Sequence, residues 1–245
     1  MTSAKKFLIL GVALLAVIVA VLITAGPSLQ RAFFYPKPHG LPQVVTQTTE
    51  QLLARLQVVL ETNAPIVARS LQQGLSEAQI SALEKQGGFR LSENLKSLYR
   101  WRNGMPTNSS CGLLPGQRFL PLDEFVRQQA LMRQQVGSAT SAQRAGFKIF
   151  AGYMKNAVHV LDDGAGDGYF YDPERTDGEG AFFYHMAEER YYVWFPSLNN
   201  FLSGTVECYE GRIFKVSADG KGLEEDSQRA QKIWGRLAKS SEDGS

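Results

Sequence analysis

The stretch that most constrains the fold is residues 147–172, FKIFAGYMKNAVHVLDDGAGDGYFYD. Two apolar runs, residues 157–161 and 169–171, flank the segment DDGAGDG at residues 162–168. Glycine and aspartate tolerate the positive φ angles of a tight reversal, whereas aromatic and β-branched residues favour strands. The stretch therefore predicts a β-hairpin with a glycine-rich, acidic turn.

Negative charge is concentrated in this hairpin and the residues that follow it. Residues 156–189 contain nine acidic residues and one basic residue, Arg175, which gives a formal charge of −8. The whole chain of 245 residues carries +2. Such an uneven distribution of charge along the chain suggests a partner with positive charge. We therefore expect the hairpin to bind another protein that has a basic surface.

The order of expected elements indicates the fold class. Strands rich in aromatic and β-branched residues are expected at residues 147–151, 157–161, 168–171, 181–184 and 191–195. Helices are expected before them, beginning near Thr48, after Ser76, after Ser92 and at residues 122–136, and one more is expected after Ser197. Helices, then consecutive strands, then a helix indicate an α+β fold in which helices pack on an antiparallel sheet.

An apolar segment near the N-terminus predicts membrane attachment. Residues 7–25 form an uncharged run of 19 residues, which at about 1.5 Å per residue is just long enough to cross a bilayer core. A cleaved signal peptide is the alternative, but its apolar region is typically only about 7–15 residues long. We expect a single-pass membrane protein. Because a short N-terminus with Lys5 and Lys6 usually stays in the cytoplasm, the domain is expected outside it.

These features divide the chain into four parts. We expect a transmembrane anchor at residues 1–26, a proline-punctuated linker with a juxtamembrane helix at 27–65, the α+β domain at 66–212 and a polar tail at 213–245. The tail contains a short amphipathic helix, which could lie on a membrane surface or pack on its own domain. Cys111 and Cys208 could form a disulfide outside the cytoplasm, or they are two small buried side chains.

Several kinds of chemistry find little support in the sequence. Asp163, Asp167, Gly168 and Glu174 match positions of a calcium-binding EF-hand loop, but Ala165 occupies a ligand position and strands replace the flanking helices. The sequence contains no P-loop, no G-x-S-x-G and no H-E-x-x-H. It also lacks a basic stripe typical of nucleic-acid binding. We therefore expect no metal, no cofactor, no nucleic acid and no catalytic residues.

The aromatic residues of the strands divide between core and surface. Most of them are expected in the core, but tyrosine and tryptophan beside acidic residues are typical of surfaces that bind proteins. Alternation along a strand places Tyr169 and Tyr171 on one face. The candidate partner-binding residues are Asp162, Asp163, Asp167, Tyr169, Tyr171, Asp172 and Trp194.

Four segments follow one another along the chain: LSEAQISALEKQGGFRLSENLKSLYRWRNGM from residue 75, LLPGQRFLPLDEF from residue 113, the hairpin stretch from residue 147, and VWFPSLNNFL from residue 193. Their order resembles the SUKH superfamily (Smi/Knr-like domains). The resemblance covers residues 75–206 and implies helices packed on an antiparallel sheet, with no catalytic residues. It departs from the family at Leu91-Ser92, where Leu-Pro is usual, and in the membrane anchor, which is not typical of cytosolic immunity proteins.

The resemblance implies a protein-binding role, because members of the superfamily include bacterial immunity proteins and fungal regulators of cell-wall assembly. Together with the apolar run, it predicts a membrane-anchored interaction module in the cell envelope that has no catalytic activity. Two alternatives stay open: an immunity protein that neutralises a polymorphic toxin, and an enzyme that acts on a cell-wall polymer.

Overall fold

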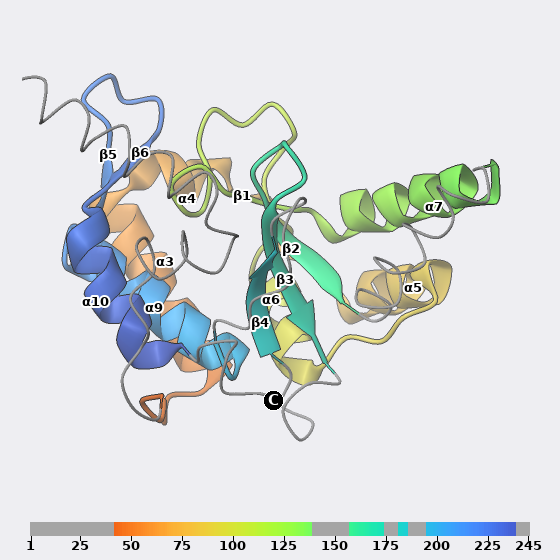
Figure 1. The fold of residues 1–245 in the computed structure, drawn as a ribbon, viewed down its shortest axis with the longest axis horizontal. Coiled ribbons are helices and arrows are strands. Elements are labelled where there is room, and N and C mark those ends of the chain that lie inside the picture. The colour runs from red at the N-terminus through yellow and green to blue at the C-terminus, as the bar shows by residue number, and fades with distance from the viewer. Residues whose placement is uncertain (1–41, 139–156, 174–180, 186–194, 239–245) are drawn as a thin grey trace, which may run out of the picture. The chain divides into compact units, whose positions relative to one another are not determined.

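Helices surround a four-stranded antiparallel sheet in the computed structural model, whose strand order is β1-β2-β3-β4 (Figure 1). The structure describes residues 42–138, 157–173, 181–185 and 195–238. The strands of this sheet are β1 (Arg118–Phe119), β2 (Val158–Asp162), β3 (Gly168–Asp172) and β4 (Ala181–His185). A second, two-stranded sheet pairs β5 (Phe214–Val216) with β6 (Leu223–Glu225).

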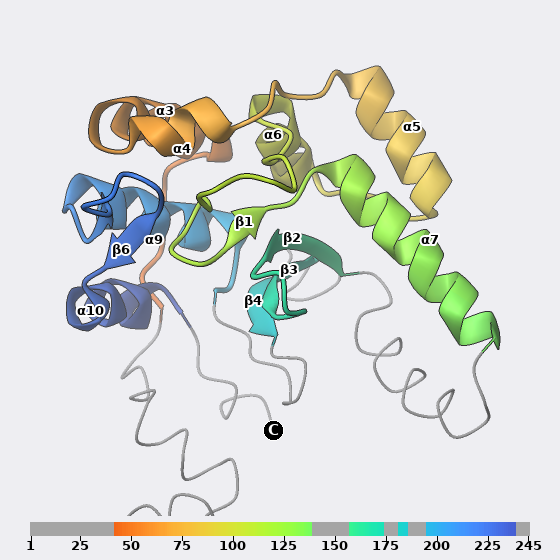
Figure 2. The same ribbon diagram turned by 90° about the horizontal axis from the view of Figure 1, so that it is seen from above.

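The helices lie on two sides of the main sheet (Figure 2). On one side are α3, α9 and α10, and on the other are α5 and α7. The helix bounds are α3 (Thr49–Asn63), α4 (Pro65–Ser70), α5 (Glu77–Gly87), α6 (Glu93–Trp101), α7 (Leu122–Ser138), α9 (Leu198–Glu210) and α10 (Ser227–Leu237). The predicted α+β fold, with helices packed on an antiparallel sheet, is confirmed.

Side-chain caps explain where several helices begin. Thr48 and Ser76 form capping boxes with Gln51 and Gln79, so that α3 and α5 start with paired backbone amides. Ser92 caps α6 by accepting a hydrogen bond from the backbone N–H of Leu95. These three starts agree with the predicted ones. The short helix α4 was not expected; it begins with Pro65, and proline is well tolerated at the first helical position.

Helix α3 belongs to the core, whereas the sequence placed it in a juxtamembrane linker. Its residues Leu52, Leu56 and Leu60 are fully buried, and Thr49 donates a hydrogen bond to the side chain of Asn199 at the start of α9. The sequence predicted the helix, but it could not show that α9 covers the apolar face.

The C-terminal region also packs into the domain, although the sequence suggested a polar tail from residue 213. Trp234 on α10 stacks on Phe201 at a centroid distance of 6.2 Å and meets Phe195 edge-on at 5.4 Å. Gly204 makes room for it, since a Cβ there would lie 2.1 Å from the Trp234 ring. Of the two positions left open for this helix, packing on its own domain is therefore the observed one.

Some expectations fall outside the described residues. These are the apolar run at residues 7–25, the strand expected at 147–151 and all but Phe195 of the strand expected at 191–195. In the part of the chain that the structure describes, no helix has the length and hydrophobicity needed to span a bilayer.

The two cysteines do not form a disulfide. Cys111 and Cys208 are both free and buried, which agrees with the alternative of two small buried side chains. Burial raises the pKa of the Cys208 thiol to about 12.

Candidate partner-binding site

The turn between β2 and β3 is held by its own aspartates. The backbone N–H of Asp163 donates to the carbonyl oxygen of Asp167 at 3.1 Å. Oδ1 of Asp163 accepts hydrogen bonds from the backbone N–H groups of Ala165 and Asp167 at 2.8 and 3.1 Å, and Oδ1 of Asp162 accepts one from Gly164 at 2.9 Å. Gly164 has a φ of 84°, a conformation that glycine adopts without strain. The turn thus has one internally bonded shape.

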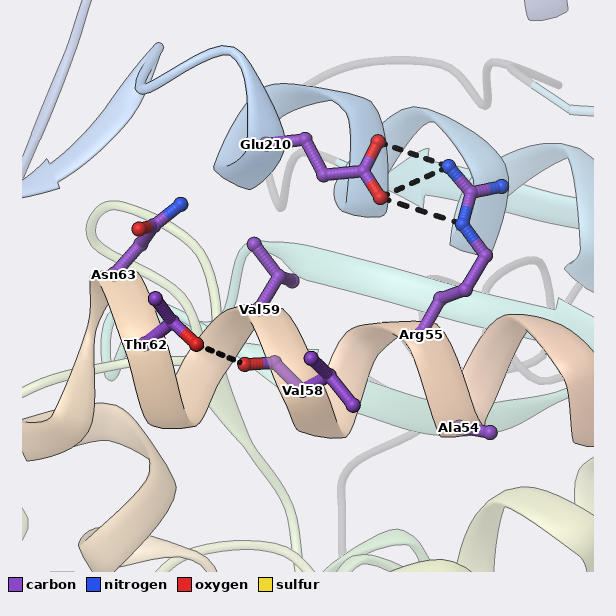
Figure 3. Close-up of a pocket in the computed structure, with 7 residues that line it drawn as sticks. All are labelled: Ala54, Arg55, Val58, Val59, Thr62, Asn63 and Glu210. Carbon is purple, nitrogen blue, oxygen red and sulfur yellow. Dashed lines mark hydrogen bonds and ion pairs between the residues drawn. The ribbon is translucent and has the colours of Figure 1, made fainter.

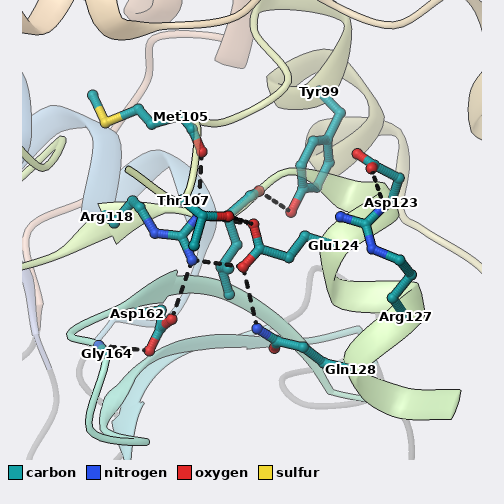
Figure 4. A network of polar contacts seen from close by, with 11 residues as sticks. Tyr99, Met105, Thr107, Arg118, Asp123, Glu124, Arg127, Gln128, Asp162 and Gly164 are labelled. Carbon is teal, nitrogen blue, oxygen red and sulfur yellow. Dashed lines mark hydrogen bonds and ion pairs between the residues drawn. The ribbon is translucent and has the colours of Figure 1, made fainter. Parts of the chain in front are cut away.

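An ion pair anchors the base of this hairpin (Figure 4). Arg118 on β1 donates two hydrogen bonds to the Glu124 carboxylate on α7, at 2.9 and 2.7 Å, and approaches Oδ2 of Asp162 at 3.4 Å. Their side chains are 15%, 12% and 13% exposed. The hydrogen bond from Arg118 lowers the pKa of Glu124 and raises that of Arg118. We call these three residues the Arg118 clamp; it joins β1, β2 and α7.

The Arg118 clamp has the features of a structural ion pair. It does not support the alternative of an enzyme that acts on a cell-wall polymer. A glycosidase needs one carboxyl group with a raised pKa to protonate the leaving group. The pKa of Glu124 is lowered instead, so Glu124 stays ionised and paired. Both clamp carboxylates bind the same guanidinium.

The predicted acidic residues occupy different environments. Asp163 is exposed at the turn, while Asp167 and Asp172 are partly exposed. Asp162 is mostly buried and bonded to Arg118 and Gly164. The structure therefore brings Asp163 and Asp167 together at an accessible tip and gives Asp162 a supporting position below it. That these residues bind a partner stays a prediction.

The predicted aromatic residues lie mainly in the core. Tyr171 is fully buried, and its hydroxyl donates a hydrogen bond to Oγ of Ser92 at 2.8 Å. The expectation that Tyr171 lies at a surface is therefore wrong, because the N-terminus of α6 covers that face of β3. Tyr169 is partly buried, with ring centroids 5.0 Å from Tyr184 and 5.3 Å from Phe201. Trp194 lies outside the described residues.

The buried position of Tyr171 makes a testable prediction. Replacing Tyr171 by phenylalanine removes the hydroxyl that bonds Ser92, and we expect the free energy of unfolding to fall by about 1 kcal/mol. Chemical denaturation of Tyr171→Phe, Ser92→Ala and the double variant measures this coupling. Additive effects of the two changes would contradict the hydrogen bond. Because Tyr171 is buried, Tyr171→Phe should bind a protein partner as well as the wild type does.

Arg118 and Glu124, which hold the hairpin in place, were not predicted from the sequence. Both lie in the segment RFLPLDE, where charged residues stand at the two ends of a run of four apolar ones. A charged residue between buried apolar residues often has a buried counterion, and this pattern could have indicated a pair. It could not identify Asp162, which is 44 positions further along the chain, as the second acid.

A second surface feature lies between α3 and α9 (Figure 3). This open groove of about 450 Å³ is lined by Ala54, Arg55, Val58, Val59, Thr62, Asn63 and Glu210. Its carboxylate, Glu210, forms an ion pair with Arg55 at 2.9 Å. Val58, one of the lining residues, is an exposed apolar residue with 65% of its surface accessible. No pattern in the sequence indicated this groove.

Metal ligands do not converge in the described residues, where no group of three or more His, Cys, Asp or Glu side chains is placed to hold an ion. In the hairpin, Oδ1 of Asp163 already accepts two backbone hydrogen bonds. Glu174, the last position of the loop considered for calcium, lies outside the described residues.

Comparison with known proteins identifies the domain. The model of the SMI1 / KNR4 family (SUKH-1) matches residues 74–204, just over half of the chain. The matched region runs from the residues before α5 into α9 and includes the Arg118 clamp and the β2–β3 hairpin. No curated protein matches the chain by sequence. The resemblance seen in the sequence is thus confirmed, and the chain belongs to the SMI1 / KNR4 family (SUKH-1).

Proposed function

We propose that this chain is a protein-binding module without catalytic activity, which binds a basic surface of another protein through the tip of the β2–β3 hairpin. Membership of a family that includes immunity proteins and interaction modules supports this role. Both charge and geometry favour the hairpin as the binding surface. It lies in a segment of formal charge −8, and its tip exposes Asp163 beside Asp167.

The observation that carries this proposal is the rigid presentation of the acidic tip. The Arg118 clamp fixes the base of the hairpin, and hydrogen bonds from Ala165 and Asp167 fix the turn. A loop held in one conformation loses little entropy when it binds. Charges at the edge of an interface mainly speed association and select the partner.

We further propose that residues 7–25 anchor the module in a membrane and that the domain lies outside the cytoplasm. The length and lack of charge of this run support an anchor, and Lys5 and Lys6 support the orientation. Alkaline phosphatase fused after Ser245 tests the orientation, since an active fusion is expected and an inactive one would place the domain in the cytoplasm.

Neutralising the tip should slow association with the partner. Asp163→Asn combined with Asp167→Asn removes two charges, while the amide oxygen introduced at position 163 can still accept the hydrogen bonds of the turn. We expect the association rate to fall by about ten-fold at low ionic strength, and by less at high ionic strength because salt screens the wild-type charges. Surface plasmon resonance with the partner protein, once it is identified by crosslinking, measures the association rate at low and at high ionic strength.

A matched control for this experiment lies in the other hairpin. Asp219 in the β5–β6 turn is exposed and accepts hydrogen bonds from Ser217 and Lys221 in a similar way. Asp219→Asn should leave the association rate unchanged. Equal rates for the double variant and the wild type would exclude the hairpin tip as the binding surface.

An immunity protein is the second candidate, because the family includes such proteins. In that case, expressing this chain should protect a cell from the toxin encoded by an adjacent gene. The double variant Asp163→Asn, Asp167→Asn should lose this protection while remaining folded. If no toxin gene adjoins this one, the regulatory role in the envelope is favoured.

A further inference from the structure

The chain enters the described domain at the C-terminal end of α10. Residues 42–48 form an extended strap in which the backbone N–H of Gln43 donates to the carbonyl oxygen of Arg236 at 2.7 Å, and Arg236 donates to Oε1 of Gln43 at 2.9 Å. Asn200, which is 5% exposed, joins the two segments by donating to the carbonyl oxygens of Gln43 and Leu237, each at 3.1 Å. The strap is therefore attached to the C-terminal end of α10 through Gln43.

The exposed face of α10 carries three basic side chains, two of which pair with acidic residues from outside the helix. Arg229, Lys232 and Arg236 are spaced three and four residues apart, which places them on one side of the helix. The helix itself, SQRAQKIWGRL, contains no acidic residue. Arg229 and Arg236 have ion-pair partners, Asp226 at 3.9 Å and Glu207 at 2.6 Å, yet their side chains stay 54% and 49% exposed. We call these three basic residues the α10 stripe.

The tether between the apolar run and the strap is short and basic. Residues 26–41 contain Arg31 and Lys37 and no acidic residue. Even fully extended, these 16 residues span only about 55 Å. If residues 7–25 lie in a bilayer, the α10 stripe is held close to the lipid headgroups at a high effective concentration. Val44, with 82% of its surface accessible, adds an apolar side chain at the same end of the domain.

We propose that the α10 stripe rests on anionic lipid headgroups, so that this end of the domain faces the bilayer. The inference depends on the membrane anchoring proposed above. Each lysine or arginine near an anionic surface strengthens binding roughly five-fold. The strap and the β2–β3 turn lie at opposite ends of the domain in Figure 1. Contact at the Arg236 end of the stripe, where α10 meets the strap, would therefore keep the acidic hairpin away from a surface of the same charge.

The test uses the full chain in vesicles of phosphatidylcholine, with or without added phosphatidylglycerol. A fluorophore is attached at Gln228→Cys, beside the stripe, and the lipid headgroups carry a quencher. We expect more quenching when phosphatidylglycerol is present, and a loss of that increase in Lys232→Glu. Lys85→Glu, an equal change of charge on the exposed side of α5, should keep it. A fluorophore at Ala165→Cys on the hairpin tip should be quenched less than one at Gln228→Cys.

Two results would overturn the inference. One is equal quenching at Gln228→Cys in both kinds of vesicle, and the other is a Lys232→Glu variant that behaves as the wild type. If the chain washes off the vesicles in high salt, the anchor is wrong as well, and the inference with it. The role of the hairpin is judged separately, because the association rates of the Asp163 and Asp167 variants are measured in detergent without a bilayer.

Discussion

Replacing Leu56 by alanine should lower the free energy of unfolding by about 3 kcal/mol. Leu56 is fully buried on α3, the helix that packs against α9, and alanine would leave a cavity in addition to the lost burial. Urea denaturation of the wild type and of Leu56→Ala measures the difference. The effect is large because α3 belongs to the core of the domain even though it precedes the matched region at residues 74–204.

The control for this prediction lies on the same helix. Val58 is 65% exposed, so Val58→Ala should change the free energy of unfolding by less than about 0.5 kcal/mol. A small effect of Leu56→Ala, similar to that of Val58→Ala, would mean that α3 is a linker helix that does not support the fold. It would also remove the reason to begin the domain at the strap.

Breaking the Arg118 clamp should have the second largest effect. Arg118→Met keeps most of the side-chain volume but leaves the Glu124 and Asp162 carboxylates facing each other without a cation. Removing one partner of a buried ion pair typically costs about 3–5 kcal/mol. Because these side chains keep some exposure to solvent, we expect a loss of about 2 kcal/mol. As a control, Arg127→Met breaks an exposed pair with Asp123 and should cost less than about 0.5 kcal/mol.

The loss in Arg118→Met should depend on pH. The hydrogen bond from Arg118 lowers the pKa of Glu124, so this pair stabilises the folded protein above the ordinary glutamate value of 4.5 and less so as the pH falls through the lowered pKa. The difference between wild type and Arg118→Met should therefore be largest near neutral pH and shrink below pH 4.5. A difference that is constant or grows on acidification would contradict the clamp.

Local signals explain the parts of the fold that could be predicted from the sequence. The caps at Thr48, Ser76 and Ser92 are short-range patterns, and each marks a helix that begins where it was expected. The β2–β3 hairpin was equally clear, because its turn is made of glycine and aspartate. Together these elements were sufficient to predict the α+β fold and the family.

Contacts between distant segments could not be predicted in the same way. The strand β1 has only two residues and exists because it pairs with β2 across the chain. The sheet of β5 and β6 consists of three-residue strands in a polar stretch, and it was interpreted as a tail. Tyr171 was expected at a surface because alternation along a strand assigns faces but does not show what covers them.

The candidate site, like the fold, could be predicted from the sequence only in part. Charge counting identified the acidic hairpin, and the structure separates its aspartates by environment: Asp163 is exposed at the tip, whereas Asp162 is held in the clamp. Arg118 and Glu124, which hold that clamp together, come from elements that only the fold brings beside Asp162.

The most direct test of the proposed binding surface is site-specific photocrosslinking of the full chain in its native membrane. A photoreactive residue at Ala165 places the probe on the exposed tip of the β2–β3 hairpin, and one at Lys221 places it on the exposed β5–β6 turn. We expect a discrete adduct from Ala165 that is absent from Lys221 and that weakens in high salt and in the double variant Asp163→Asn, Asp167→Asn. The same adduct from both positions, or one that persists in the double variant, would contradict the proposed binding surface.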